Sequence, residues 1–124
     1  MTIDYSKIEK NLISEIKLSY IQAKIFILIV IQGKMSGKKI SEKLEIPLSE
    51  ALHNSKNLMD LGAFIDMPND EFEAMHPRFT AVNMYRKMCE REKIEFKKNL
   101  IVDNIGVVLE KPYDDARTKY NNTK

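Results

Sequence analysis

The stretch that most constrains the fold is residues 36–62, with the sequence SGKKISEKLEIPLSEALHNSKNLMDLG. Ser36 is a good N-cap for a short helix in which Ile40 and Leu44 form an apolar pair on one face. Pro47 then interrupts the helical pattern, because proline cannot donate a backbone hydrogen bond and restricts the residue before it. The pattern therefore predicts a short helix followed by a tight turn.

A second, longer helix is predicted from about residue 48 to residue 61, and Gly62 suits the left-handed position that closes it. One side of this helix is apolar or small: Leu48, Ala51, Leu52, Ser55, Leu58 and Met59. The other side carries polar side chains: Glu50, His53, Asn54 and Asn57, with Ser49 and Lys56 on the flanks. A helix that buries one face and presents polar groups on the other is typical of the recognition helix of a helix-turn-helix.

Two further helices are predicted before this motif. Residues 3–17 have apolar side chains at spacings of three and four, as an amphipathic helix does. Ser19 and Gln22 form a capping box that opens the next helix, over residues 20–32. That helix is apolar nearly all round, so it is expected to lie at the centre of the core, and Gly33 is expected to end it.

The periodicity changes after Gly62. Residues 63–67 and 71–75 are short runs separated by the turn-forming residues 68–70 (Pro-Asn-Asp). They predict a β-hairpin, the wing of a winged helix. The expected fold is therefore mainly α with a small β-hairpin: a winged helix-turn-helix over residues 1–80, followed by C-terminal dimerisation helices over residues 81–120.

The C-terminal part is predicted to contain a helix capped by Thr80, a strongly apolar helix over residues 100–110, and a break at Pro112 with a further helix over 112–120. Packing of the apolar helix onto its own domain competes with packing onto a second copy, and we favour the second, because a winged helix already has a complete core. Ile105 and Val108 are the expected centre of the dimer contact. The full set of expected interface residues is Tyr85, Met88, Leu100, Ile101, Ile105, Val108 and Leu109.

Residues 12–80 resemble the winged helix-turn-helix domain of archaeal TrmB-type transcription regulators. The residues that carry the resemblance are Leu18-Ser19-Tyr20, Ala23-Lys24, Ser36 through Ile46-Pro47, Leu61-Gly62 and Phe79-Thr80-Ala81-Val82. The resemblance implies a cytoplasmic regulator that binds double-stranded DNA as a homodimer. Larger members carry a C-terminal sugar-binding domain that this chain is too short to hold, so no sugar effector is expected, and any other small-molecule effector is unknown.

The expected DNA-binding residues are Ser36, Lys38, Lys39, Ser49, Glu50, His53, Asn54, Lys56 and Asn57. Asparagine can pair with adenine, and lysine can contact phosphate. The DNA-facing side of such a recognition helix usually has arginine or lysine, whereas here it has Glu50, His53, Asn54 and Asn57. The hairpin region is acidic as well: Asp66, Asp70, Glu71 and Glu73 stand against the single Arg78. Two alternatives therefore stay open, namely an ordinary solvated helix surface for these side chains, and a winged-helix protein-interaction module without specific DNA binding.

The amino-acid composition bears on which other classes of protein this chain could belong to. The net charge of +2 does not by itself indicate nucleic acid. One cysteine and two histidines are too few for a standard zinc cluster, and Cys89 is expected to be a buried small side chain. No nucleophile–base pair or phosphate loop is evident, so neither an enzyme nor a cofactor is expected. The longest apolar run, Ile25–Ile31, is too short to cross a bilayer, and no signal peptide is evident, so a cytoplasmic protein without membrane contact is expected.

Overall fold

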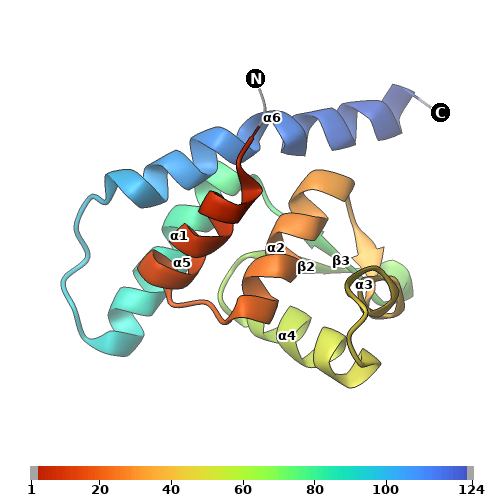
Figure 1. The fold of residues 1–124 in the computed structure, drawn as a ribbon, viewed down its shortest axis with the longest axis horizontal. Helices are drawn as coiled ribbons and strands as arrows, with labels where there is room; N and C mark the ends of the chain where they lie inside the picture. The colour runs from red at the N-terminus through yellow and green to blue at the C-terminus, as the bar shows by residue number, and fades with distance from the viewer. Residues whose placement is uncertain (1–2, 123–124) are drawn as a thin grey trace.

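A computed structural model describes residues 3–122, with side chains through residue 118. Within this range the chain is mainly helical and has one small antiparallel sheet (Figure 1). The elements in chain order are α1 (Tyr5–Ile16), α2 (Tyr20–Gln32), β1 (Met35–Ser36), α3 (Gly37–Leu44), α4 (Leu48–Asp60), β2 (Phe64–Met67), the 3-10 turn η1 (Pro68–Asp70), β3 (Glu71–Ala74), α5 (Pro77–Glu92) and α6 (Leu100–Asn122). No described helix combines the length and the apolar character that crossing a membrane would need.

Helices α2 and α3 begin at the caps predicted from the sequence. The Ser19 hydroxyl accepts a hydrogen bond from the backbone N–H of Gln22 at 3.1 Å, and the Gln22 side chain accepts one from the backbone N–H of Ser19 at 3.0 Å. This reciprocal pair is the predicted capping box at the start of α2. The Ser36 hydroxyl caps α3 in the same way, by accepting from the backbone N–H of Lys39 at 3.1 Å.

The predicted hairpin is confirmed, and it gains a third strand. Strands β2 and β3 pair antiparallel, with Phe64 opposite Ala74, and the turn between them has positive φ at Asn69 (67°) and Asp70 (58°). Asparagine and aspartate tolerate this conformation better than most residues. The third strand, β1, pairs with β3 and gives the sheet order β1-β3-β2. A two-residue strand is too short to produce a recognisable alternation, so sequence patterning did not predict it.

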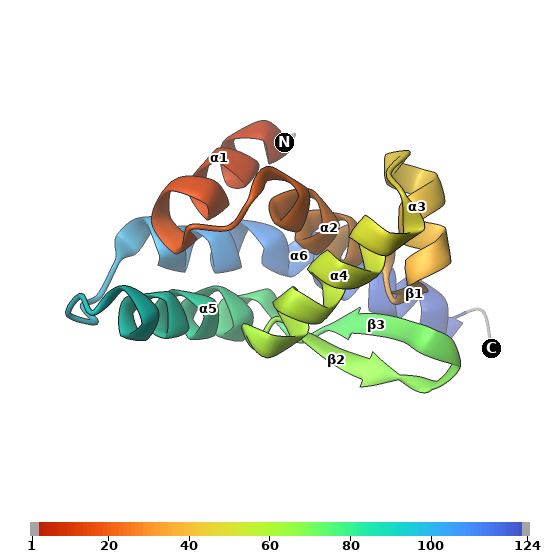
Figure 2. The same cartoon turned by 90° about the horizontal axis from the view of Figure 1, so that it is seen from below.

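Helix α2 lies at the centre of the core, as its apolar circumference predicts. Ile25, Phe26 and Ile29 are fully buried. Helix α2 packs against α1, α4 and α6, and its Phe26 ring stacks on Phe64 of β2 with 6.3 Å between ring centroids. Figure 2 shows α4 and the β2–β3 hairpin on the side of α2 away from α1. The core therefore fixes the position of α4 relative to the hairpin.

The C-terminal helices differ from the prediction in their limits. Helix α5 begins at Pro77 with His76 as its N-cap, so Thr80 is a buried residue of the first turn and not the cap. Helix α6 continues through Pro112 from Leu100 to Asn122, so the expected break and separate helix over 112–120 are wrong. Proline removes one backbone donor, and the packing of α6 along α1, α2 and α5 outweighs that loss.

The expected dimer contact needs a correction. Met88, Ile105 and Leu109 are at most 2% exposed within the single chain, so they belong to its own core and are not a free surface for a second copy. Ile105 and Leu109 lie on α6 itself, which packs against α1, α2 and α5 and thereby turns its apolar side into the chain's own core (Figure 1). The core is shared by residues on both sides of the predicted boundary at residues 80 and 81, which falls inside α5.

The remaining expected interface residues have different environments. Leu100 and Ile101 are 72% and 45% exposed, and Tyr85 and Val108 are half-buried. Phe96, in the loop after α5, lies with its ring 5.8 Å from that of Tyr85 and is 49% exposed. Phe96, Leu100 and Ile101 therefore stay accessible near the loop between α5 and α6, at the opposite end of the molecule from α3 (Figures 1 and 2). Other exposed large apolar side chains lie outside this loop: Tyr20, Leu48, Ile65, Phe79 and Val107.

Candidate nucleic-acid interface

Helices α3 and α4 are held together by a tight turn and a close contact. Glu45 adopts a left-handed conformation with φ 55°, and the backbone N–H of Ile46 donates to the Ser41 carbonyl at 3.1 Å. Gly37 lies so near Leu52 that a Cβ atom at position 37 would collide with the leucine side chain. Because the two helices approach this closely, the orientation of α4 is fixed by packing and not by the turn alone.

Helix α4 buries most of the predicted apolar side, although Leu48 is 48% exposed, and it presents the predicted polar side. Ala51, Ser55 and Leu58 are fully buried. On the opposite side, four of the expected DNA-binding residues are exposed and two are half-buried: Ser49, Glu50, His53 and Lys56 in the first group, and Asn54 and Asn57 in the second. The polar residues singled out from the sequence therefore share one outward face of α4.

Two of these side chains already form hydrogen bonds along the helix. The Asn54 amide nitrogen donates to the Glu50 carbonyl at 2.9 Å, and the Asn57 amide nitrogen lies 3.3 Å from His53 Nε2. Reading adenine bidentately needs both the amide nitrogen and the amide oxygen of an asparagine. Asn54 would therefore have to exchange its contact with Glu50 for the base edge.

Helices α3 and α4 carry four exposed lysines. Lys38, Lys39 and Lys43 on α3 and Lys56 on α4 are all exposed. None of the four forms an ion pair with any residue of the described chain, unlike Lys24, Lys98 and Lys111 elsewhere. Ser36, also expected at the interface, is half-buried and committed to its capping bond. The positive charge of these lysines is thus directed to solvent.

An open groove of about 580 Å³ separates α3 and α4 from the hairpin. Lys38 and Lys56 line its helical side, and Asp66 and Asp70 line its hairpin side. The exposed acidic side chains of the hairpin therefore face the same groove as two of the lysines. A phosphate entering the groove would meet charges of both signs.

One of the four acidic residues of the hairpin has a structural role. Glu73 forms an ion pair with Arg117 of α6, and both side chains are about 20% exposed. Arg117 also donates to the carbonyl of Val30 at 2.6 Å, at the end of α2, and lies 3.8 Å above the ring of Tyr113. The charge of Glu73 is thereby neutralised, and the acidity presented to solvent comes mainly from Asp66 and Asp70 with half-buried Glu71.

Helix α6 braces the base of the hairpin through these contacts. The Tyr113 hydroxyl donates to the carbonyl of Ala74 at 3.1 Å, and burial raises the pKa of Tyr113. Sequence reasoning missed Arg117 and Tyr113, because their partners lie about 40 residues away and no local spacing marks them. The hairpin is therefore held in place by α6, a helix predicted from the sequence to form the dimer contact.

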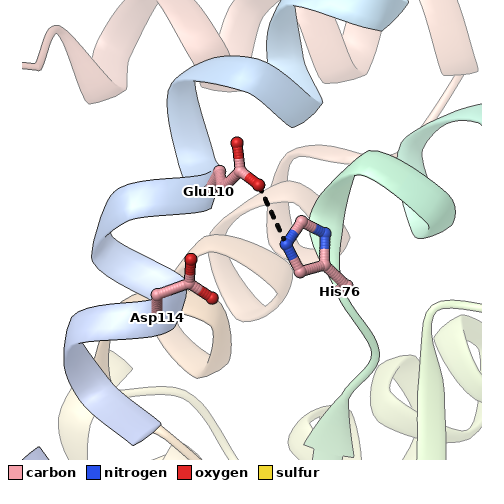
Figure 3. A group of neighbouring side chains, drawn as sticks. All are labelled: His76, Glu110 and Asp114. Carbon is pink, nitrogen blue, oxygen red and sulfur yellow. Dashed lines mark ion pairs between the residues drawn. The ribbon is translucent and has the colours of Figure 1, made fainter. Parts of the chain in front are cut away.

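The remaining chemically active side chains lie away from this face. Cys89 is buried, as predicted. His76 caps α5, and its side chain lies near those of Glu110 and Asp114 on α6 (Figure 3). These three residues can supply ligand atoms within 4.8 Å of one another. No local spacing marks this group, because His76 lies more than 30 positions before Glu110 and Asp114.

No family model matches this chain, and neither the curated proteins nor the solved structures contain a significant match.

Proposed function

We propose that the chain is a transcription regulator that binds double-stranded DNA through a winged helix-turn-helix formed by α3, α4 and the β2–β3 hairpin. The observation that carries the proposal is the polar outward face of α4, with Asn54, Asn57 and His53, in a helix pair whose exposed lysines form no ion pair within the described chain. The sequence resemblance to TrmB-type regulators supports the same function and a cytoplasmic location.

The proposed binding mode divides the residues into two groups. Helix α4 enters the major groove, where Asn54 and His53 read base edges. Lys38, Lys39 and Lys56 contact phosphates, which supplies affinity without sequence preference. If each chain of a dimer made three such contacts, the logarithm of affinity would fall with the logarithm of salt with a slope of roughly −5.

We propose homodimerisation through the loop between α5 and α6 and the adjoining end of α6. Among the described residues, this region carries Ile94, Phe96, Leu100 and Ile101, each between 45% and 72% exposed. Exposed apolar side chains that are close together indicate an interaction surface. A two-fold dimer would present one α4 to each half of a symmetric DNA site.

A second candidate, a protein-interaction module, is supported by a different observation. Asp66 and Asp70 are exposed on the hairpin. In a winged helix that binds DNA through its hairpin, these positions would lie against phosphate. An acidic hairpin suits a basic protein partner better than a nucleic acid. In this alternative the exposed lysines of α3 are ordinary solvated side chains.

Selection from a pool of random DNA duplexes tests the proposal. The unaltered chain should enrich related sequences with two half-sites separated by about one helical turn. A variant carrying Lys38→Ala and Lys39→Ala should bind more weakly to every sequence in the pool. Absence of any binding at low salt would contradict the proposal and favour the protein-interaction module.

A further inference from the structure

A mixed nitrogen and oxygen cluster lies between the start of α5 and the middle of α6. His76 Nε2 is 3.4 Å from a carboxylate oxygen of Glu110, and Asp114 follows Glu110 by one helical turn. Figure 3 shows both carboxylates of α6 directed toward the His76 ring across the space between the two helices. The three side chains can bring one ligand atom each to within 4.8 Å of one another.

Within the described chain, hydrogen bonds and ion pairs neutralise only part of the negative charge of this cluster. Glu110 pairs with His76 and with Arg78, the latter at 3.5 Å. Asp114 forms no hydrogen bond or ion pair with any described residue, although it points toward the same space. Of the two carboxylates only that of Glu110 is paired, so the cluster can accommodate more positive charge.

We propose that His76, Glu110 and Asp114 bind one divalent transition-metal ion, with Zn²⁺ as the representative cation. One imidazole nitrogen and two carboxylate oxygens suit Zn²⁺ and its first-row neighbours, whereas Mg²⁺ and Ca²⁺ prefer oxygen ligands alone. Three protein ligands leave further positions for water.

The hydrogen bonds around these three residues limit the affinity of the site for a metal ion. His76 Nδ1 accepts from the backbone N–H of Arg78 at 3.2 Å, as the N-cap of α5. A cation on Nε2 of the neutral ring places the proton on Nδ1, so that this capping bond is lost. The Arg78 guanidinium, which pairs with the other oxygen of Glu110, repels an incoming cation. The lost capping bond and this repulsion both oppose binding, and we expect micromolar affinity.

The site would act as a cross-link within the fold. His76 follows the hairpin strand β3 closely, whereas Glu110 and Asp114 belong to α6. A bound cation would hold the start of α5 against α6 and thereby stabilise the folded chain. This inference uses no residue of the proposed DNA interface, so either proposal can fail without the other.

Calorimetric titration of the untagged, metal-free full chain with Zn²⁺ tests the site. One ion per chain should bind, and at about 100 times the dissociation constant it should raise the melting temperature by about 10 °C. Mg²⁺ or Ca²⁺ at the same concentration should give no such shift. Absence of saturable Zn²⁺ binding below millimolar concentration would overturn the proposal and leave the cluster as an ordinary ion pair.

The chain offers a matched control for two of the three ligands. Its two histidines are His76 and the exposed His53 of α4, so His76→Gln should abolish the Zn²⁺ effect while His53→Gln keeps it. Asp115, next to Asp114, is paired with Lys111, so Asp114→Asn should weaken binding while Asp115→Asn does not. Loss of an outer-shell partner alone weakens metal binding by about 10- to 100-fold, and loss of a ligand should do at least as much.

A third variant should act in the opposite direction. Arg78→Ala removes the cation that competes for Glu110, so it should tighten Zn²⁺ binding. Each substitution is checked for folding by circular dichroism without metal. Equal Zn²⁺ binding by His76→Gln and the unaltered chain would place the ion elsewhere and contradict the proposed site.

Discussion

Gly106 of α6 lies against Arg78 of α5 so closely that a Cβ atom at position 106 would stand 2.7 Å from the Cα of Arg78. It would also stand 3.1 Å from the carbonyl oxygen of Pro77. Both neighbours are backbone atoms, which cannot move aside as a side chain can. The two C-terminal helices are therefore packed on each other within one chain, and residues on both helices join its hydrophobic core.

Gly106→Ala should destabilise the fold. Alanine is favoured over glycine in a solvent-exposed helix, but the collision with α5 outweighs that preference here. Overpacking of this kind costs about 1–3 kcal/mol in free energy of unfolding. Denaturation by urea measures the change, with Asn104→Ala, at an exposed position of the same helix, as the control. A more stable Gly106→Ala chain would show that the two helices lie farther apart.

Ile105→Asp should affect folding, whereas Leu100→Asp should affect only the proposed dimer. Ile105 is fully buried, so an aspartate there places a charge in the core and should unfold the chain. Leu100 is 72% exposed, so aspartate should change the free energy of unfolding by no more than about 0.5 kcal/mol and should weaken the proposed dimer. Circular dichroism and sedimentation measure the two effects. A folded, monomeric Ile105→Asp chain beside a dimeric unaltered chain would restore the original prediction for that residue.

Removal of the exposed acidic charges of the hairpin should strengthen non-specific DNA binding. Asp66→Asn with Asp70→Asn removes two negative charges from the groove beside Lys38 and Lys56, and asparagine tolerates the positive φ of position 70. Fluorescence anisotropy with a random duplex measures the affinity. Glu92→Gln with Asp115→Asn removes the same charge from other exposed positions and is the control.

The outcome of that comparison separates the two proposed functions. Tighter DNA binding only in the hairpin variant supports a hairpin close to phosphate. Equal affinities for both variants would place the hairpin away from DNA and favour a protein partner for Asp66 and Asp70.

Local signals in the sequence predicted the elements that depend on neighbouring residues. The capping box of Ser19 and Gln22, the cap at Ser36 and the polar face of α4 all involve spacings of a few residues, and each is present. The hairpin was predicted from its turn residues, although its strands are short and partly acidic.

Features that depend on distant residues were missed or misjudged. The apolar helix over 100–110 was assigned to a second subunit, because its sequence cannot show that α1, α2 and α5 leave a face for it. The ion pair of Glu73 with Arg117 and the approach of His76 to Glu110 also join residues far apart in the chain. Periodicity identifies which side of a helix is apolar, but not which partner covers it.

Binding of the Asn54→Ala chain to two duplexes tests whether α4 reads DNA sequence, as we propose. On a duplex selected by the unaltered chain, loss of the Asn54 amide should cost about 1–3 kcal/mol in binding free energy, whereas on a random duplex the affinity should hardly change. Lys39→Ala is the matched control, since loss of a phosphate contact should weaken binding to both duplexes alike and make the salt dependence shallower. Equal loss of affinity on both duplexes from Asn54→Ala, or no loss on either, would contradict the claim.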